Sequence, residues 1–547
     1  MSVILPIYNV EQYLAECLDS LLSQSHRDVE IVVVDDGSPD GSRRIAESYA
    51  RDDSRIRIVT RENGGLGAAR NTGVAHASGE YLTFVDSDDK LPPAALSKLL
   101  QSARGSGSDV IAGAIQRFRS DRAWKPTWVE PLHSEPRTGI TIDDFPALVR
   151  NNYTCSKLFR RDFWTEQGLA FREGVSYEDQ PLVTQLYIAA ARIDVVPDVV
   201  YLYRQREDAS SISQQTASLK DLRDRISAWR MSRKEFAETA STAVYDAWLK
   251  TLFDAHFHWY LRSPGTADLA YWAALRSAIV DLTANAPVWI WESTTPENRV
   301  PIELARRNRR ADLQEFVRRE GNSPSKFPAK VVDGGVRHEL PFHDDRDLDP
   351  SLFLRRPEQL VLSHSVQTFR WVEGDTMRLG GWAYIRYVDL VGRDVTTTLI
   401  LSNRRTGHEH AVVAARRAHP AFPPPGVDEW VDYSGSEFEA VVAMADVIGA
   451  DRRDGDVWDV RLRVETVGFA VEDSVRRVRR SASAGVPGAG ELAGGDLLTV
   501  AWQLNTPFRL VLRPLRVEAV DVDLTGRTLR GRLAGPQAHE AHSVKVV

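Results

Sequence analysis

Three carboxylates crowd into one short segment of the chain, Asp86-Ser87-Asp88-Asp89. Their charges repel one another unless something positive lies between them. Carboxylate oxygens suit a hard divalent cation such as Mg²⁺ or Mn²⁺, and such ions usually keep open positions for a substrate phosphate. The segment therefore predicts a metal bridge to a nucleotide diphosphate.

A glycine-rich segment at residues 64–67 precedes this acidic cluster. Glycine lets the backbone approach a ligand closely. Arg70 follows within the next helical pattern, where its guanidinium could reach a phosphate or order the carboxylates. The two features together favour a site that binds a phosphorylated ligand.

Short strands must hold these residues in place. Apolar runs rich in Val, Ile, Phe and Tyr alternate with helix-period stretches, and one such helix is predicted to start with Ser38 as N-cap and Pro39 as first residue. The alternation predicts a mostly parallel sheet covered on both faces, with ligands beyond the carboxyl ends of its strands. An acidic turn after a single strand is more often a helix cap, but four polar strand ends on one rim exceed what capping requires. The strands are expected at residues 2–7, 30–34, 56–60, 81–85 and 109–114.

Composition excludes several classes of protein. The chain has 547 residues and a net charge of −7, from 69 Lys and Arg against 76 Asp and Glu, which disfavours a nucleic-acid partner. Two cysteines, Cys17 and Cys155, build neither a disulfide framework nor a Cys-rich zinc site. No targeting segment and no apolar run of about 20 residues is visible. We expect a cytoplasmic protein, at most attached peripherally to the inner face of the membrane.

The pattern changes along the chain. Residues 1–215 form the α/β part, and 216–325 read as helices, with long patterns at 222–235, 243–260 and 267–282. A linker is expected at 326–358 and a β-sandwich module at 359–480. A linker with strands follows at 481–513. Residues 526–533 weakly repeat 374–381, so 514–547 is interpreted either as the start of a second β-module in a truncated chain or as a chance similarity.

Four ordered motifs resemble family 2 glycosyltransferases, which are inverting enzymes of the Rossmann-like GT-A fold that binds nucleotide sugars. They are VILPIYN at residues 3–9, VDDGS at 34–38, GAARN at 67–71 and FVDSDD at 84–89. The resemblance implies transfer from a UDP-sugar with Mn²⁺ or Mg²⁺ as cofactor. It also implies roles for single residues: Pro6, Tyr8 and Asp36 would hold the uracil with Asn63 nearby, Asp86 would meet the ribose or sugar, Asp88 would bind the metal, and Arg70 would help to fix the donor.

A second acidic motif, SYEDQ at 176–180, resembles the family's catalytic Glu-Asp pair, Glu178 and Asp179 here. Inversion requires a base for the acceptor hydroxyl, and the resemblance gives that role to Asp179. A later segment resembles the loop that closes over the diphosphate. The family's late metal-binding His is missing from residues 198–216, so Asp208, water or the donor phosphates are expected to complete the metal shell. The residues implied in the closing loop are Arg204, Arg206, Ser210 and Ser211.

The order of the parts resembles the wall teichoic acid enzymes that add N-acetylglucosamine to poly(ribitol phosphate). This implies UDP-N-acetylglucosamine as donor, a polymeric or lipid-linked acceptor such as teichoic acid or capsular polysaccharide, and homo-oligomers formed through the C-terminal β-modules. An arginine cluster at residues 306–319 favours an anionic acceptor, although a solvated basic face is the ordinary interpretation. Trp124, Trp128 and Trp164 could stack on sugars or pack in the core.

Two alternatives remain at this point. A nucleotidyltransferase should carry a basic, glycine-rich segment after its first strand, where this chain has Tyr8-Asn9-Val10-Glu11. A carbohydrate-binding or assembly scaffold with a vestigial glycosyltransferase domain should lack an intact Asp88 and Asp179, which this chain retains.

Overall fold

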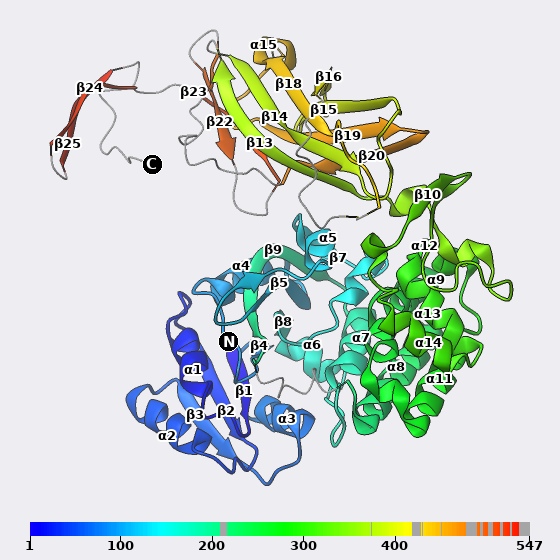
Figure 1. The fold of residues 1–547 in the computed structure, drawn as a ribbon. Helices are drawn as coiled ribbons and strands as arrows, with labels where there is room; N and C mark the ends of the chain where they lie inside the picture. The colour runs from blue at the N-terminus through cyan, green and yellow to red at the C-terminus, as the bar shows by residue number, and fades with distance from the viewer. Residues whose placement is uncertain are drawn as a thin grey trace. The chain divides into compact units, whose positions relative to one another are not determined.

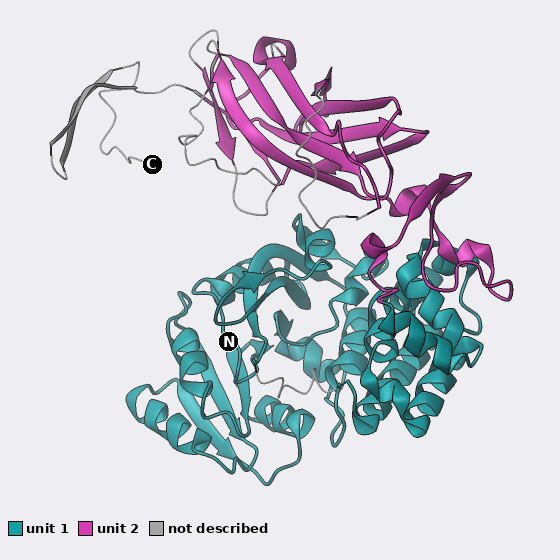
Figure 2. Ribbon diagram, in the orientation of Figure 1, with its two compact units in different colours: residues 1–319 teal, residues 320–547 magenta. Residues whose placement is uncertain are grey.

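The chain divides into two compact units, residues 1–319 and 320–547, which are described separately (Figure 2). Within the described residues, no helix is long and apolar enough to cross a membrane. The computed structural model describes residues 1–207, 216–372, 375–417, 428, 430–449, 451–476, 490–492, 496–501, 507–514, 518–525 and 528–534.

A mixed sheet forms the centre of the first unit (Figure 1). Its strand order is β3-β2-β1-β4-β8-β5-β9-β7, and the first four strands run parallel. β8 is antiparallel to both of its neighbours, so the sheet is less uniformly parallel than expected. The strands are β1 (Ser2–Ile7), β2 (Glu30–Asp35), β3 (Ile56–Thr60), β4 (Tyr81–Phe84), β5 (Val110–Phe118), β7 (Arg137–Ile140), β8 (Lys157–Arg160) and β9 (Ile193–Arg204).

Helices cover both faces of this sheet. The helices α1 (Leu14–Leu22), α2 (Ser42–Asp52) and α4 (Ala95–Ser106) share one hydrophobic core with β1 and β2. On the other face, α3 (Leu66–His76) packs against β1 and β2. Small residues bring α3 close, because a Cβ at Gly73 would lie 2.4 Å from Ile4 Cγ2. This close packing buries Arg70, which lies on the same helix.

One predicted helix start is wrong. α2 begins at Ser42 after an N-cap at Gly41, and not at Ser38 and Pro39. The Ser38 amide donates instead to Asp35 Oδ1 at 2.9 Å, which holds this residue in a turn. Asp40 Oδ1 accepts from the Ser42 amide and thereby satisfies one of the free donors at the true helix start.

The helical segment belongs to the first unit. Three long helical runs occupy the predicted positions, and the second of them contains a π-helical turn at Leu252–His256. Its helices are α8 (Leu219–Thr239), α9 (Thr242–Thr251), α10 (Phe257–Leu261), α11 (Leu269–Thr283), α12 (Val288–Ser293), α13 (Pro296–Arg306) and α14 (Arg310–Arg318).

Two antiparallel sheets form most of the second unit. One has the order β13-β14-β18-β17 and the other β16-β15-β19-β23-β22-β21, and both contribute buried side chains to one core around Trp458 and Tyr384. The predicted order of an α/β part, helices and antiparallel strands is therefore confirmed. The strands are β13 (Leu362–Val372), β14 (Thr376–Ile385), β15 (Val395–Asn403), β16 (Glu409–Val413), β17 (Ala415–Arg417), β18 (Glu437–Ala443), β19 (Val457–Thr466), β20 (Phe469–Ser474), β21 (Gly490–Glu491), β22 (Asp496–Ala501) and β23 (Arg509–Pro514).

The two copies of the weak repeat lie in equivalent positions. β14 is the second strand of a hairpin with β13, and β25 (Thr528–Ala534) is the second strand of a hairpin with β24 (Glu518–Thr525). Gly374, Gly526 and Arg527 lie outside the described residues. A second β-module beginning near residue 514 stays a prediction.

Candidate active site

The parallel strands bring the motif residues to one edge of the sheet. Ile7 lies opposite Asp35 in the β1–β2 register, so Tyr8 and Asp36 follow neighbouring strand ends. Tyr8 is 48% exposed, which leaves an aromatic ring at the edge of the sheet. Pro6 is buried within β1 and faces Val34 of β2.

Asp36 organises the loop that follows β3. Its buried carboxylate accepts from the amides of Gly64 at 3.1 Å and Gly65 at 2.8 Å, and it pairs with Arg61 at 3.0 Å. Gly65 has φ +87°, a conformation that favours glycine. Asn63 lies in this loop, and its main-chain nitrogen would be 3.3 Å from a Cβ added at Gly37. The structure thus brings together Asp36 and Asn63.

Arg70 links the two acidic motifs. Its Nη2 donates to Asp86 Oδ1 and its Nη1 to Glu178 Oε1, both at 2.6 Å. The guanidinium also lies 5.1 Å from the centroid of the Phe171 ring, and the Arg70 side chain is only 4% exposed. Of the two roles considered for Arg70, the geometry matches the ordering of the carboxylates, since both of its terminal nitrogens are engaged by them.

The Glu-Asp pair lies at the start of a helix. Glu178 is the N-cap of α7 (Asp179–Ala189), where the helix dipole favours a negative charge. Burial raises the pKa of Glu178 to about 7, although Arg70 opposes the rise. Burial also raises the pKa of Asp179, against the attraction of Arg70 and Arg225. Asp179 is thus a carboxylate with increased proton affinity that lies among cationic groups.

The acidic cluster does not converge on one point. Asp88 Oδ2 accepts from Arg206 Nε at 2.8 Å, whereas Asp86 is bound to Arg70. Asp89 Oδ2 accepts from the Tyr201 hydroxyl at 2.8 Å. Burial raises the pKa of Asp88 and raises that of Asp89 well above its usual range, and neighbouring carboxylates add to both shifts. The repulsion expected from the sequence is therefore present.

Strand β9 brings the predicted closing-loop arginines to this cluster. The Arg204 amide donates to Asp89 Oδ1 and its Nε to the main-chain oxygen of Asp88, both at 2.6 Å. The Arg206 guanidinium lies 4.9 Å from the centroid of Tyr13. Two other residues predicted for this loop, Ser210 and Ser211, lie outside the described residues, as does Asp208.

At this cluster a metal ion would be bound by a single protein carboxylate, that of Asp88. Across the part of the chain that the structure describes, no group of three or more His, Cys, Asp or Glu side chains could hold an ion. Mg²⁺ is commonly bound by one or two carboxylates together with substrate phosphates. Asp88 fits that pattern as a single carboxylate ligand, because the nearby Asp86 carboxylate adds negative charge that would favour a cation there, in place of the Arg206 guanidinium that now pairs with it.

The helical segment supports the Glu-Asp pair through contacts that the sequence analysis missed. The Tyr177 hydroxyl donates to Asp221 Oδ1 at 2.6 Å, and Tyr260 donates to the other oxygen of Asp221 at 3.0 Å. The Arg225 guanidinium lies 3.4 Å from the centroid of the Tyr177 ring. The only local signal is the position of Tyr177 directly before Glu178.

The arginine cluster on α13 and α14 is largely paired with its own neighbours. Glu303 binds Arg306 and Arg307, and Asp312 and Glu315 bind further arginines, at spacings of three or four residues. The ordinary interpretation as a solvated, charge-balanced face therefore suits this cluster better than a phosphate site.

The three tryptophans have different surroundings. Trp164 is 2% exposed and packs against Phe84 at a centroid distance of 5.3 Å, so it is a core residue. Trp128 stacks on Tyr153, with 5.9 Å between the ring centroids. Trp124 lies below the Arg122 guanidinium, 4.9 Å from it. None of these contacts favours stacking on a sugar.

Known proteins resemble the region that carries this site. The model of the family described as Glycosyl transferase family 2 matches residues 2–166. Glycosyltransferase GlyG of Streptococcus pneumoniae is 32% identical over 218 residues, which are 38% of this chain and 71% of GlyG. Poly(ribitol-phosphate) beta-glucosyltransferase of Bacillus spizizenii is 30% identical over 39% of this chain and 33% of its own length.

A solved structure matches more of the chain. The crystal structure of S. aureus TarS covers 97% of this chain and 88% of its own, with 18% sequence identity and a TM-score of 0.51. At this identity the likeness shows the fold. Among the curated relatives, the matched region spans between 24% and 71% of their own lengths.

Proposed function

This chain belongs to glycosyl transferase family 2, and on that premise we propose that it is an inverting, metal-dependent glycosyltransferase. It moves a sugar from a UDP-sugar, with UDP-N-acetylglucosamine favoured, to a hydroxyl of a cell-envelope polymer such as teichoic acid or capsular polysaccharide. The observation that supports this proposal most is the buried Arg70, whose guanidinium bonds both Asp86, which is proposed to meet the donor, and Glu178, the neighbour of the proposed base Asp179.

The donor half of the site consists of the ends of β1, β2 and β4. Tyr8 offers a half-exposed ring on which the uracil stacks, and Pro6 holds the strand end that presents it. Asp36 and Asn63 bind the base from the neighbouring loop. Asp86, oriented by Arg70, accepts a hydroxyl of the ribose or sugar.

Asp179 is the proposed base. Its carboxylate takes the proton of the acceptor hydroxyl while that oxygen forms a bond to the anomeric carbon of the donor sugar. The bond from the anomeric carbon to the diphosphate oxygen breaks, and UDP leaves with the electron pair. Burial strengthens Asp179 as a base, and the nearby guanidiniums of Arg70 and Arg225 favour its charged form before the reaction.

The leaving diphosphate requires positive charge. Arg204, Arg206, Ser210 and Ser211 are proposed to bind its oxygens. Asp88 would hold Mn²⁺ or Mg²⁺, and a bound ion would supply charge to stabilise the leaving group.

We expect Asp88→Ala to weaken Mn²⁺ binding in the presence of UDP at least tenfold by calorimetry, whereas Asp198→Asn, a change at an exposed carboxylate, should leave binding unchanged. Equal binding by Asp88→Ala would contradict the assignment.

The acceptor is proposed from the relatives. One relative is named for acting on poly(ribitol phosphate), which supports a polymeric or lipid-linked, anionic acceptor. We also propose homo-oligomers formed through the C-terminal β-modules, no nucleic-acid partner for this mildly acidic chain, and a cytoplasmic site of action with at most peripheral attachment to the inner face of the membrane.

A donor panel tests the proposed activity. The full chain is incubated with UDP-N-acetylglucosamine, UDP-glucose and UDP-galactose, with Mn²⁺ or with EDTA, and released UDP is measured. We expect release from at least one donor that EDTA suppresses. UDP binding without hydrolysis or transfer of any sugar would instead support the scaffold with a vestigial domain.

A further inference from the structure

A groove lies along α8 in the first unit, with α11 contributing to its wall. Its volume is about 490 Å³, within the range of about 300–1,000 Å³ that ligand sites occupy. Ile226 and Ala274 give it an apolar lining, and Ser227 and Ser277 contribute hydroxyl groups. None of the described residues that line it is acidic.

Three cations line the groove from a single helix. Arg223, Arg230 and Lys234 follow one another at spacings of seven and four residues, which places them along one stripe of α8. Arg223 and Lys234 are exposed, and neither forms an ion pair with a described residue. The third, Arg230, is 3.3 Å from a carboxylate oxygen of Asp281.

That carboxylate is shared. Asp281 lies closer to Arg233, at 2.8 Å, so it compensates Arg230 only in part. The groove therefore carries two positive charges, on Arg223 and Lys234, that form no ion pair with a described residue. Exposed cations of this kind contribute little to folding, whereas aligned cations with hydroxyls and an apolar lining suit a chain of phosphates and polyols.

The groove is connected to the segment that carries the proposed base. The sulfur of Met231, which lines the groove, lies 2.7 Å from Arg172 Nη1. Gly67 packs tightly between these segments: a Cβ added there would lie 2.4 Å from the main-chain oxygen of Arg172 and 3.3 Å from Glu178 Cγ. Near the start of α8, the helix that forms most of the groove, Asp221 accepts a hydrogen bond from Tyr177.

We propose that this groove binds a phosphodiester-bearing stretch of the acceptor polymer and directs the next hydroxyl toward Asp179. The inference rests on the proposed function and adds to it where the acceptor lies. Arg223 and Lys234 pair with phosphates, Ser227 and Ser277 bond polyol or sugar hydroxyls, and Ile226 contacts the carbon chain.

A salt titration of the full chain tests the charge contacts. The probe is inorganic polyphosphate, and the variant Arg223→Ala/Lys234→Ala is compared with Arg43→Ala/Lys220→Ala. The control removes two exposed cations that are each paired with a carboxylate four residues away, and Lys220 lies on the same helix. For single-stranded nucleic acids each neutralised phosphate contributes about 0.7 to the slope of log K against log salt, and the same value per contact is used for polyphosphate. We expect the groove variant to lose about 1.4 of that slope and the control to keep it. Equal slopes for wild type and groove variant would overturn the proposal.

Other probes separate phosphate from other anions. Dextran should not bind, and polygalacturonate should bind more weakly than polyphosphate at equal charge density. Binding to phosphatidylglycerol vesicles that the groove variant loses, without binding to polyphosphate, would overturn the acceptor assignment in favour of a membrane surface.

The proposed function can fail independently of the groove. UDP release from a UDP-sugar is measured without any acceptor, so it does not depend on the groove. A wild-type chain that neither binds UDP nor releases it from a UDP-sugar contradicts the proposed function. If the wild type releases UDP but binds polyphosphate no better than the groove variant does, only the groove assignment is contradicted.

Discussion

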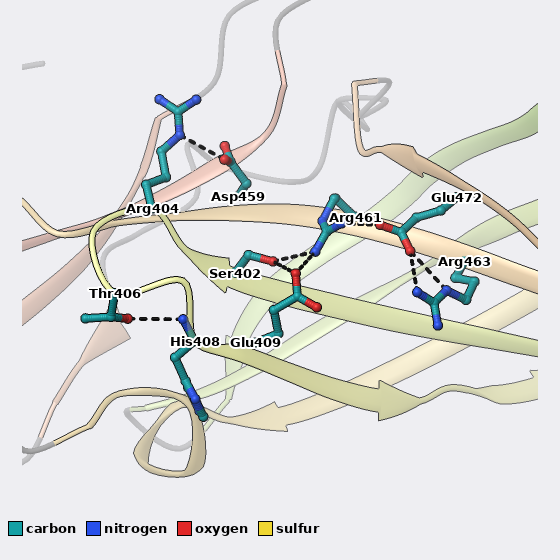
Figure 3. Close-up of polar contacts among 9 residues, drawn as sticks. All are labelled: Ser402, Arg404, Thr406, His408, Glu409, Asp459, Arg461, Arg463 and Glu472. Atoms are coloured by element: carbon teal, nitrogen blue, oxygen red, sulfur yellow. Dashed lines mark hydrogen bonds and ion pairs between the residues drawn. The ribbon is translucent and has the colours of Figure 1, made fainter.

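Arg70 in the first unit and Arg461 in the second unit each bridge two carboxylates. In the first unit Arg70 binds Asp86 and Glu178, with side-chain exposures of 4% for Arg70 and 5% for Glu178. In the second unit Arg461 of β19 binds Glu409 and Glu472, and Glu409 is 53% exposed (Figure 3). The same groups therefore form the same contacts in very different surroundings.

The difference in burial determines what each bridge does. An exposed ion pair is screened by water and contributes about 0–1 kcal/mol. A buried pair has paid a desolvation cost that often cancels its attraction, but breaking it leaves a charge without compensation. The Arg461 bridge is thus a cross-strand surface contact, whereas the Arg70 bridge is better explained by the positions and pKa values it imposes on the acidic motifs.

Removal of the buried arginine should have the larger effect on stability. Arg70→Ala leaves Asp86 and Glu178 without their cation, and we expect it to lower the free energy of unfolding by about 3–5 kcal/mol in urea titrations. Arg70→Met, which keeps most of the volume, should lose nearly as much, because charge rather than packing is responsible. A loss below about 1 kcal/mol for both variants would contradict the account.

The protonation of Glu178 should make the buried site sensitive to pH. Its folded pKa of about 7 lies above the ordinary 4.5, so the folded state binds this proton more tightly. The stabilisation is therefore complete below about pH 4.5 and is lost as the pH rises through 7, on the order of 3 kcal/mol for the full shift. We expect Glu178→Gln to remove this slope in urea titrations between pH 5 and 8. Glu47→Gln, at an exposed ion pair, should keep it.

The exposed bridge should give the smallest effect. A double-mutant cycle of Arg461→Ala and Glu409→Ala, which removes the exposed partner, should yield a coupling energy of about 0.2–1 kcal/mol that declines in 1 M salt. The corresponding cycle of Arg70→Ala and Glu178→Ala should exceed it several-fold and change little with salt. Equal couplings would remove the distinction between the two bridges.

The sequence predicted the fold class because its signals are local. Strand ends, glycines and carboxylates follow one another in a fixed order, and parallel strands must bring such ends to one edge. The start of α2 was missed because Asp35 and Glu11 bind nearby amides and so hold residues 38–41 outside the helix. A cap of this kind depends on a residue about thirty positions away.

Contacts across long stretches of chain escaped prediction at the site as well. Tyr177 meets Asp221 over 44 residues, and nothing in the helical periodicity of α8 marks Asp221 or Arg225 as partners of the Glu-Asp pair. The arginine cluster at 306–319 was easier to interpret, because its carboxylate partners three or four residues away are visible in the sequence and favour the solvated, charge-balanced face.

The most direct test of the central claim is transfer by the Asp179→Asn variant, measured together with UDP binding. If Asp179 is the base, kcat should fall by about 10²- to 10⁴-fold, the usual contribution of a general base, while the Kd for UDP stays within twofold. Asp198→Asn makes the same chemical change at an exposed ion pair and should retain full activity. Unchanged transfer by Asp179→Asn would contradict the assignment of Asp179 as the base.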